Sequence, residues 1–198
     1  MIYGLKQYPR AWHAKLSVFL QEAGFLRSAA DSSLFVQSGS NETVVVLVYV
    51  DDLIIAGNSD HTISQLKGTL QSRFPIKDLS HLNYFLGIEM AASSKGLFLN
   101  QRKYILDLLK DAEMMNSKPA PTPLDSKLKL NSASAPLQAI NDYQQLVNKL
   151  IYLTITLPNI TYAVSLVSQF MHAPMFFHLG IVKRILRYLK GSLGMGLS

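Results

Sequence analysis

Two adjacent aspartates, Asp51 and Asp52, are the residues whose type and spacing predict chemistry most directly in this chain. They interrupt an apolar run, which occupies 44–50 before them and 53–56 after them. Short β-branched and aliphatic segments of this kind are typical of strands buried on both faces of a sheet. We therefore expect a β-hairpin in which the two acids form the connection, since Asp tolerates the backbone angles of a tight turn better than most residues.

The charge of this pair indicates what it could bind. Neighbouring carboxylates repel one another, and in an apolar hairpin they need a cation to neutralise them. Magnesium binds oxygen ligands and commonly takes one or two carboxylates together with the phosphates of a substrate. The pair therefore predicts a magnesium site that a phosphate-bearing substrate completes. A solvated turn in which neither carboxylate binds anything is the alternative that the pair alone leaves open.

The segments around this hairpin predict an α+β fold. A proline near its start and helical spacing indicate a helix over 9–24, whose expected core and stop residues are Trp12, Leu16, Phe19, Leu20 and Gly24. A strand around 34–36 and a capped helix from about 60 to 74 flank the acid hairpin, and strands over 83–89 and 96–99 form a second hairpin. Further helices are expected over 101–115, 142–156, 160–172 and 176–190.

A proline-rich segment divides the chain. Prolines alternate with other residues over 118–123, and polar residues continue the segment to 136, which is typical of an extended linker. We expect one region over 1–100 that contains both hairpins, and a helical region over 101–198 that contains the linker near 118–136.

The net charge of +6 comes from the second region. Residues 1–100 contain eight basic and eight acidic residues, whereas residues 101–198 contain eleven and five. A basic part beside a neutral part with an acidic site suits a protein that holds a polyanion, and an ordinary basic surface is the alternative. The chain has no Cys, no apolar run of the roughly 18–20 residues that a membrane span needs, and no signal-peptide pattern. We therefore expect an intracellular protein without a membrane partner.

The last expected helix carries a basic ridge. At about 100° per residue, four cations fall within roughly a third of the helix circumference, opposite an apolar face. They are Lys183, Arg184, Arg187 and Lys190. Such a ridge can follow the backbone of a nucleic-acid duplex through phosphate contacts, and a solvated helix face is the alternative.

Four motifs in order resemble the reverse transcriptase of copia-type long-terminal-repeat retrotransposons. The first is Ile2-Tyr3-Gly4-Leu5-Lys6-Gln7, followed by Pro9-Arg10-Ala11-Trp12. The second is Tyr49-Val50-Asp51-Asp52, and the third is Tyr84-Phe85-Leu86-Gly87-Ile88-Glu89. The last comprises Leu150-Ile151-Tyr152-Leu153-Thr154 and Arg184-Ile185-Leu186-Arg187-Tyr188-Leu189-Lys190-Gly191. The resemblance covers nearly the whole chain and corresponds to the rear part of the polymerase domain.

The resemblance implies a partial polymerase palm followed by a helical region similar to a thumb or connection. It implies that Asp51 and Asp52 are catalytic and bind two Mg²⁺ ions in the parent enzyme, with a template–primer and deoxynucleotides as partners. The residues that it places at the nucleotide and template are Gly4, Lys6, Gln7, Tyr49 and Val50. The residues that it places at the primer grip are Phe85, Leu86 and Gly87.

The chain also departs from the family pattern. A third metal-binding carboxylate, within a pattern like Asp-Val-x-x-Ala-Phe-Leu, is absent because the chain begins just before the Tyr-Gly-Leu-Lys segment, and the ribonuclease H domain that usually follows is absent too. Ser80 replaces a usual Gly, while Leu157 and Asn159 replace a usual Arg and Asp. We therefore expect a fragment of an RNA-directed DNA polymerase that binds magnesium weakly, is inactive alone and self-associates through an exposed sheet edge. The alternative is a non-enzymatic nucleic-acid-binding remnant of a degenerate element.

Overall fold

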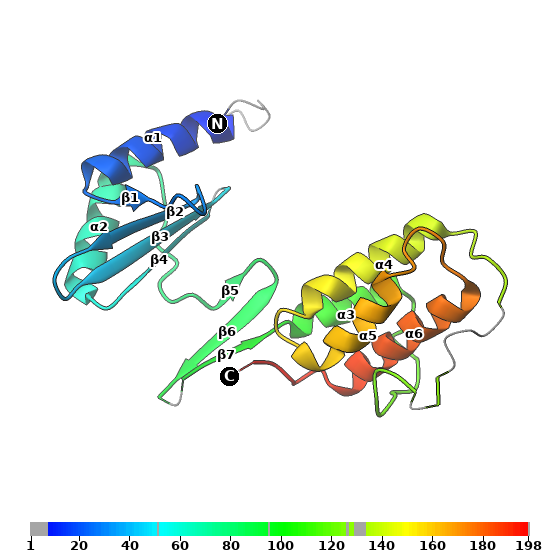
Figure 1. Ribbon diagram of the computed structural model, residues 1–198. Helices are drawn as coiled ribbons and strands as arrows, with labels where there is room; N and C mark the ends of the chain where they lie inside the picture. Colours follow the sequence, from blue (N-terminus) through cyan, green and yellow to red (C-terminus); the bar gives the residue numbers. More distant parts are fainter. Residues whose placement is uncertain (1–7, 51, 95, 126, 129–133, 198) are drawn as a thin grey trace. The chain divides into compact units, whose positions relative to one another are not determined.

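The computed structural model of this chain describes residues 8–50, 52–94, 96–125, 127–128 and 134–197. The chain divides into two compact units, Met1–His81 and Leu82–Ser198. Over the described residues the fold is α+β, with two antiparallel sheets and six α-helices that concentrate in the C-terminal part (Figure 1). None of the helices in the described ranges is long and apolar enough to cross a membrane.

The first unit is built on a four-stranded antiparallel sheet in the order β1-β2-β3-β4. Its strands are β1 (Leu26–Arg27), β2 (Leu34–Ser38), β3 (Thr43–Tyr49) and β4 (Asp52–Gly57). Along β3, Val44, Val46 and Val48 are buried, whereas Val45 and Leu47 are half-buried. The expectation of strands buried on both faces is therefore wrong, because period-two alternation gives this sheet one face in the core and one partly open face.

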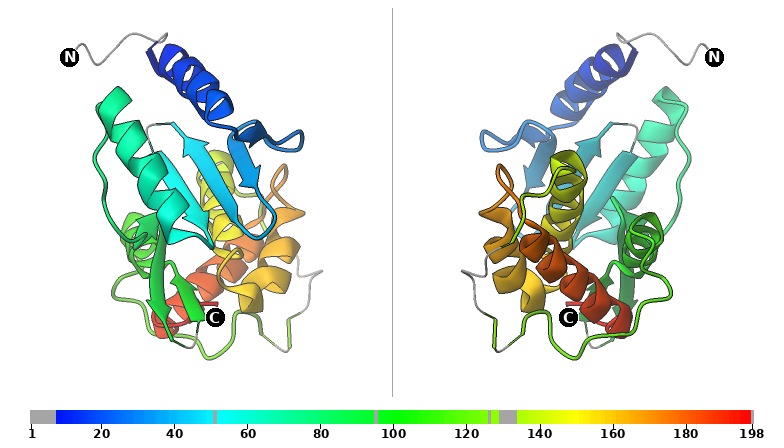
Figure 2. Two further views of the ribbon diagram at one scale, coloured as in Figure 1. Left: turned by 90° about the vertical axis from the view of Figure 1, so that its left-hand side faces the viewer. Right: turned by 90° about the vertical axis from the view of Figure 1, so that its right-hand side faces the viewer.

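Two helices cover the buried face of this sheet, α1 (Tyr8–Glu22) and α2 (Asp60–Arg73) (Figure 1, Figure 2). Leu16, Phe19 and Leu20 of α1 are buried, as the sequence predicts, and Trp12 packs against the same core. Gly24 ends α1 with a φ of 88°. The Phe25 N–H donates to the Leu20 carbonyl and the Gly24 N–H to the Gln21 carbonyl, at 2.9 and 3.0 Å, which satisfies two carbonyls of the last turn.

Capping fixes the start of α2, and a strained turn follows its end. The Ser59 hydroxyl accepts a bond from the Thr62 N–H, and Leu66 and Leu70 form the buried stripe of the helix. Ser80 then takes a φ of 67°, in the left-handed region, where a residue other than glycine is strained. The Ser80 N–H donates to Asp78 Oδ1, and this bond, with the Lys67 ammonium, holds the pKa of Asp78 below its ordinary value.

The second unit begins with a three-stranded antiparallel sheet in the order β5-β6-β7. Its strands are β5 (Tyr84–Phe85), β6 (Ile88–Ser93) and β7 (Gly96–Asn100). The predicted strand over 83–89 is therefore wrong as a single element, because Leu86 and Gly87 form a turn within it and Phe85 pairs with Ile88. Leu197 adds a β-bridge to Leu99 on the open side of β7.

A helical layer completes the second unit. Its elements are α3 (Arg102–Asp111), α4 (Ile140–Leu153), the 3₁₀ turn η1 (Pro158–Ile160), α5 (Thr161–Ser168) and α6 (Phe176–Gly191). The four α-helices have bounds close to those that the sequence predicts. Figure 2 shows α4, α5 and α6 (yellow to red) packed together, and their apolar faces form one core with α3. At the centre of this core Tyr143 is fully buried and donates its hydroxyl to the Val167 carbonyl at 2.7 Å.

Residues 117–125, the strap, lie along α6. The Ala120 N–H donates to the Arg187 carbonyl at 3.2 Å, and the Ala120 side chain is buried. The beginning of the predicted linker is thus packed on a helix in this structure. The part of that linker over 129–133 lies outside the described residues.

Candidate functional site

The tip of the β3–β4 hairpin is the candidate site. Tyr49 pairs with Asp52, so the two-residue connection consists of positions 50 and 51. The expectation that Asp51 and Asp52 together form the connection is wrong by one residue, because Asp52 is the first residue of β4. Asp51 itself lies outside the described residues.

Val50 holds an unusual backbone conformation at this tip. Its φ is 50°, in the left-handed region, where a β-branched side chain is strained. Two-residue hairpin connections favour turns whose first central residue has a positive φ, because those turns match the twist of the strands. The register of the hairpin therefore imposes on Val50 a conformation that its side chain disfavours.

The described side chains of the tip are open to solvent. Tyr49 is 45% exposed and Val50 61% exposed, and Asp52 is exposed as well. No group of three or more His, Cys, Asp or Glu within the described ranges could enclose a metal ion. An exposed carboxylate on a strand end, with a second carboxylate next to it in sequence, fits a magnesium ion that takes its other ligands from substrate phosphates.

The residues predicted to contact the nucleotide and template fall in two places. Tyr49 and Val50 lie at the hairpin tip beside Asp52. Gly4, Lys6 and Gln7 lie outside the described residues, which begin with α1 at Tyr8.

The residues predicted for the primer grip lie in the second unit. Phe85 ends β5, and Leu86 and Gly87 form the connection to β6 with φ values of 50° and 81°. The Tyr152 hydroxyl of α4 donates a hydrogen bond to the Leu86 carbonyl. The turn is therefore held by a helix that follows it by more than 60 residues in sequence.

The basic ridge lies on α6 opposite buried Val182, Ile185 and Leu189, as the helical projection predicts. Lys183 is exposed, whereas Arg187 and Lys190 are half-buried. Arg187 Nε donates to the Lys118 carbonyl at 2.6 Å, and Lys190 Nζ donates to the Ser117 carbonyl at 2.7 Å. Together with Arg184, whose contacts are described next, three of the four ridge residues hold the strap.

Arg184 binds the far end of the strap. Its guanidinium donates to the Thr122 carbonyl and hydroxyl at 3.3 and 3.1 Å and forms an ion pair with Asp125 at 3.4 Å. The sequence held a signal for these contacts, because an extended proline-rich segment forms no internal hydrogen bonds and leaves its carbonyls available to cations. The helical projection missed them because it considers one element at a time.

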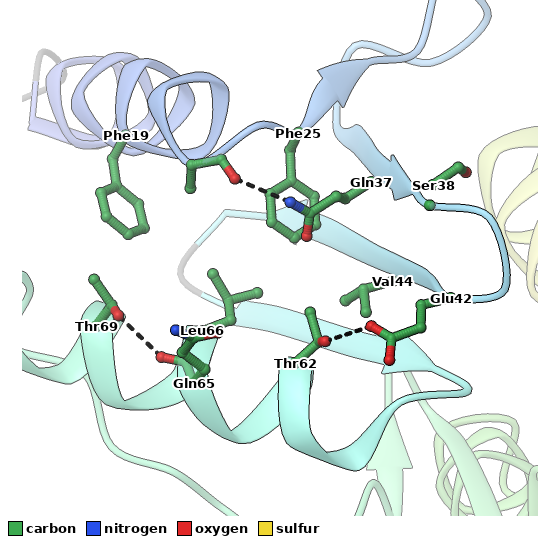
Figure 3. Close-up of a pocket in the computed structure, with 12 residues that line it drawn as sticks. Phe19, Phe25, Gln37, Ser38, Glu42, Val44, Thr62, Gln65, Leu66 and Thr69 are labelled. Carbon is green, nitrogen blue, oxygen red and sulfur yellow. Dashed lines mark hydrogen bonds between the residues drawn. The ribbon is translucent and has the colours of Figure 1, made fainter.

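A cavity of about 540 Å³ lies at the other end of β3, away from the acid tip (Figure 3). Phe19, Phe25, Val44 and Leu66 form its apolar lining. On its polar side the Thr62 hydroxyl donates to Glu42 Oε2 at 2.8 Å, and Gln37 donates to the Ala23 carbonyl at 3.1 Å. Sequence reasoning missed this cavity, since the space arises where α1, α2 and the β2–β3 connection meet.

The fold and the hairpin together define an α+β protein in which an exposed aspartate, Asp52, begins the second strand of a tight hairpin and follows another aspartate in sequence. Comparison with known families then identifies the family. The model of the family "Reverse transcriptase (RNA-dependent DNA polymerase)" matches residues 1–126, so the chain belongs to this family.

Several of its relatives are Pol polyproteins of copia-type retrotransposons. The chain is 45% identical over 197 residues to the retrovirus-related Pol polyprotein from transposon RE1 of Arabidopsis thaliana, which covers 99% of this chain. It is 37% identical to the corresponding polyprotein from transposon TNT 1-94 of Nicotiana tabacum, over 98% of this chain. It is also 35% identical to a putative transposon Ty5-1 protein of Saccharomyces cerevisiae, over 95% of this chain and 62% of that protein.

The match covers a small part of the larger relatives. The chain spans 13% of the length of the RE1 polyprotein and 15% of the TNT 1-94 polyprotein. No solved structure gives a significant match to the chain.

Proposed function

We propose that this chain is a part of an RNA-directed DNA polymerase that contributes the acid hairpin of the polymerisation site and a helical region that holds the template–primer. The observation that carries the proposal is the tip of the β3–β4 hairpin, where Asp52 begins β4 opposite Tyr49 and a strained Val50 completes an exposed turn. In this assignment residues 1–100 are a partial fingers and palm region and residues 101–198 a thumb-like or connection-like region. This functional division differs from the compact units, since β5–β7 belong to the second unit.

The reaction is nucleotidyl transfer. The 3′-hydroxyl of a primer attacks the α-phosphate of a deoxynucleotide, a new phosphodiester bond forms, and pyrophosphate leaves. Asp51 and Asp52 would hold magnesium, and the ion would supply stabilisation of the charge that develops on the phosphate oxygens. Tyr49 and Val50 form the floor beneath the primer end, while Gly4, Lys6 and Gln7 contact the nucleotide and template.

The remaining site residues hold the nucleic acid. Phe85, Leu86 and Gly87 lie against the primer strand. Of the ridge, Lys183 is exposed, and an arginine has five donors, so the strap bonds of Arg187 leave further N–H groups for phosphate.

The proposal includes inactivity of the chain by itself. Two carboxylates without a third protein ligand bind magnesium weakly, because the ion gives up its waters reluctantly. No Asp-Val-x-x-Ala-Phe-Leu pattern occurs in the 198 residues. Binding of a primer–template duplex without polymerisation is the second candidate function, and the exposed Lys183 favours it.

Primer extension tests the proposal. The chain is mixed with a primer annealed to an RNA template, deoxynucleotides and magnesium, and duplex binding is measured by fluorescence anisotropy over a range of salt. We expect binding that weakens with salt and no extension. Asp51→Asn and Asp52→Asn should leave binding intact or slightly stronger, and Asp60→Asn on α2 is the matched control for removal of a negative charge.

Two results would contradict this assignment. Extension that Asp51→Asn abolishes would mean that the chain completes its own set of carboxylates. Absence of both extension and salt-dependent binding would remove the enzymatic and the binding function together and leave only the family membership.

A further inference from the structure

The Leu86–Gly87 turn adopts a conformation that its sequence alone does not favour. Both residues have positive φ values, 50° and 81°, and they connect the pair Phe85–Ile88. Gly87 adopts such angles without strain, whereas Leu86 carries a Cβ that makes them costly. Strained residues of this kind persist where surrounding contacts fix them.

Two tyrosines supply these contacts. The Tyr152 hydroxyl on α4 donates to the Leu86 carbonyl, and the ring of Tyr104 on α3 meets the Tyr152 ring edge-on at 5.2 Å between centroids. A Cβ built on Gly87 would lie 3.5 Å from the Tyr104 ring and 3.7 Å from the Tyr152 ring. The backbone of the turn therefore rests on the aromatic pair.

A carboxylate makes a second link from the same strands to the helices. Glu89 on β6 accepts a hydrogen bond through Oε1 from the Lys103 N–H at 2.9 Å, in the first turn of α3. Gln101 occupies the N-cap of α3 and provides no side-chain cap, so Glu89 satisfies a helix-terminal N–H from a neighbouring element. A negative charge at a helix N-terminus is also favoured by the helix dipole.

We infer that Tyr152 and Glu89 are positioning residues, which fix the Leu86–Gly87 turn to α3 and α4 so that the turn and these helices move as one body while the chain holds a primer end. This inference rests on the proposed function for its role at the primer, but the link itself is a property of the second unit. It also joins two motifs, since Tyr152 belongs to the Leu150–Thr154 motif and the turn belongs to the Tyr84–Glu89 motif.

Measurement of the distance between β6 and α4 tests whether the Leu86–Gly87 turn moves together with the helices. The chain has no cysteine, so Ala92→Cys on β6 and Gln145→Cys on α4, both at exposed positions, accept two spin labels without competing sites. Pulsed electron resonance should give a narrow distance distribution in the labelled chain and a broader one after Tyr152→Phe. Tyr162→Phe, at a tyrosine on α5 that is 75% exposed, is the matched control and should leave the distribution unchanged.

Duplex binding tests the role at the primer. Tyr152→Phe should weaken binding to a recessed primer–template by about fivefold, the effect of one lost hydrogen bond, and leave binding to a blunt duplex unchanged. A purely structural defect would weaken both alike. Glu89→Gln keeps an acceptor oxygen and removes the charge, so it provides a second, milder variant if Tyr152→Phe folds poorly.

The outcomes separate the link from the proposed function. A broadened distribution with selective loss at the recessed end supports the inference. A distribution that stays narrow in both variants overturns the link, whether or not nucleic acid binds. A broadened distribution with equal effects on both duplexes overturns the positioning role. No binding of either duplex by the unmodified chain overturns the proposed function, and with it the role at the primer.

Discussion

Val50 stands at the tip of the acid hairpin with a φ of 50°, and this single dihedral angle affects both stability and function. A non-glycine residue held in the left-handed region costs about 1–3 kcal/mol. Such strain is often found where a site needs a fixed geometry, and here it adjoins the two acids. The register of the hairpin is therefore maintained although it strains the backbone of Val50.

Replacement of this valine should relieve the strain. Asn tolerates the left-handed region far better than a β-branched residue, so Val50→Asn should raise the free energy of unfolding by about 1 kcal/mol. Urea denaturation followed by circular dichroism measures the change. Val18→Asn, at an exposed valine within α1, is the control and should give no gain. Equal stability of Val50→Asn and the unmodified chain would show that the turn is not strained.

His178 should make the stability of the second unit depend on pH. Its Nδ1 accepts the Met175 N–H at 3.0 Å, its ring stacks on Phe170 at 3.8 Å, and burial lowers its pKa below the ordinary value of 6.5. The unfolded chain therefore takes up this proton at a higher pH than the folded chain. Stability should be complete above about pH 6.5 and should fall as the pH drops from there towards the lowered pKa.

Chemical denaturation between pH 5 and 8 checks this dependence. His178→Asn should flatten the curve below about pH 6.5, whereas His172→Asn, at an exposed position, should leave it unchanged. A curve that keeps its full slope in His178→Asn would assign the dependence to another group.

At the scale of a single element, helix α6 both packs into the core and binds the strap. One face supplies five buried residues to the apolar core, and the ridge holds the strap through Arg184, Arg187 and Lys190. Lys183 has no hydrogen bond to the strap within the described residues, so it is the ridge cation most available to phosphate.

The two tasks can be separated by mutation. Arg187→Ala should lower the free energy of unfolding by about 1 kcal/mol, because the Lys118 carbonyl loses its donor. Lys183→Ala should leave stability unchanged and reduce the log–log salt slope of duplex binding by about 0.9, the value for one phosphate contact on DNA. A quadruple Ala variant whose slope falls by about 3–4 units would mean that all four cations also contact backbone phosphates. An unchanged slope in every variant would remove the ridge from the nucleic-acid surface.

The edge of the first sheet is a second element with a testable consequence. Within the described residues β4 pairs with β3 alone, and Ile54 lies half-buried on the sheet face away from the helices. Open edges recruit other strands, so we expect association that increases with protein concentration. Sedimentation velocity should show less association for Ile54→Lys than for Val18→Lys on α1. A monomer over a wide concentration range in the unmodified chain would contradict this expectation.

Elements with a regular period could be predicted from the sequence, and strained or tertiary features could not. Leu16, Phe19 and Leu20 identified the buried face of α1, and Gly24 identified its end. No signal in the sequence indicated that Val50 and Leu86 lie in turns, because neither side chain favours a positive φ. Only the pairing of the strands imposes this backbone angle. The contacts of the strap and of Tyr152 join segments more than 60 residues apart, which no local pattern encodes.

The candidate site also has features that the sequence predicts and features that it does not. The type and order of Asp51 and Asp52 identified the hairpin, but the position of the turn shifted by one residue. The sequence identified the Tyr84–Glu89 motif, for which we predict a role at the primer, as a segment, whereas the aromatic rings beside Gly87 became visible only in the structure.

At the scale of the whole molecule, the two units have separate cores and different charges. The buried clusters of the first and second units share no residue. Residues 1–81 contain seven basic and seven acidic residues, whereas residues 82–198 contain twelve and six, so the second unit carries the net charge of +6. Each unit therefore meets the usual condition for a domain, a core of its own.

Independent folding of the second unit follows from this separation. A chain of residues 82–198 should show helical circular dichroism and a cooperative thermal transition, and should retain the salt-dependent duplex binding of the full chain. The unit of residues 1–81 should bind duplex weakly by comparison, since its charges balance. A gradual, non-cooperative transition in residues 82–198 would show that its core needs the first unit.

The strap also has a consequence for mutational tolerance. Arg187 and Lys190 bind backbone carbonyls, and the side chains of Lys118, Pro119 and Pro121 are exposed. Many side chains at these three positions would present the same carbonyls, whereas a change in the helix removes the donor itself. We therefore expect related proteins to vary in sequence at these three strap positions. Selection for folding acts on the cations of α6, so we expect these cations to vary more slowly.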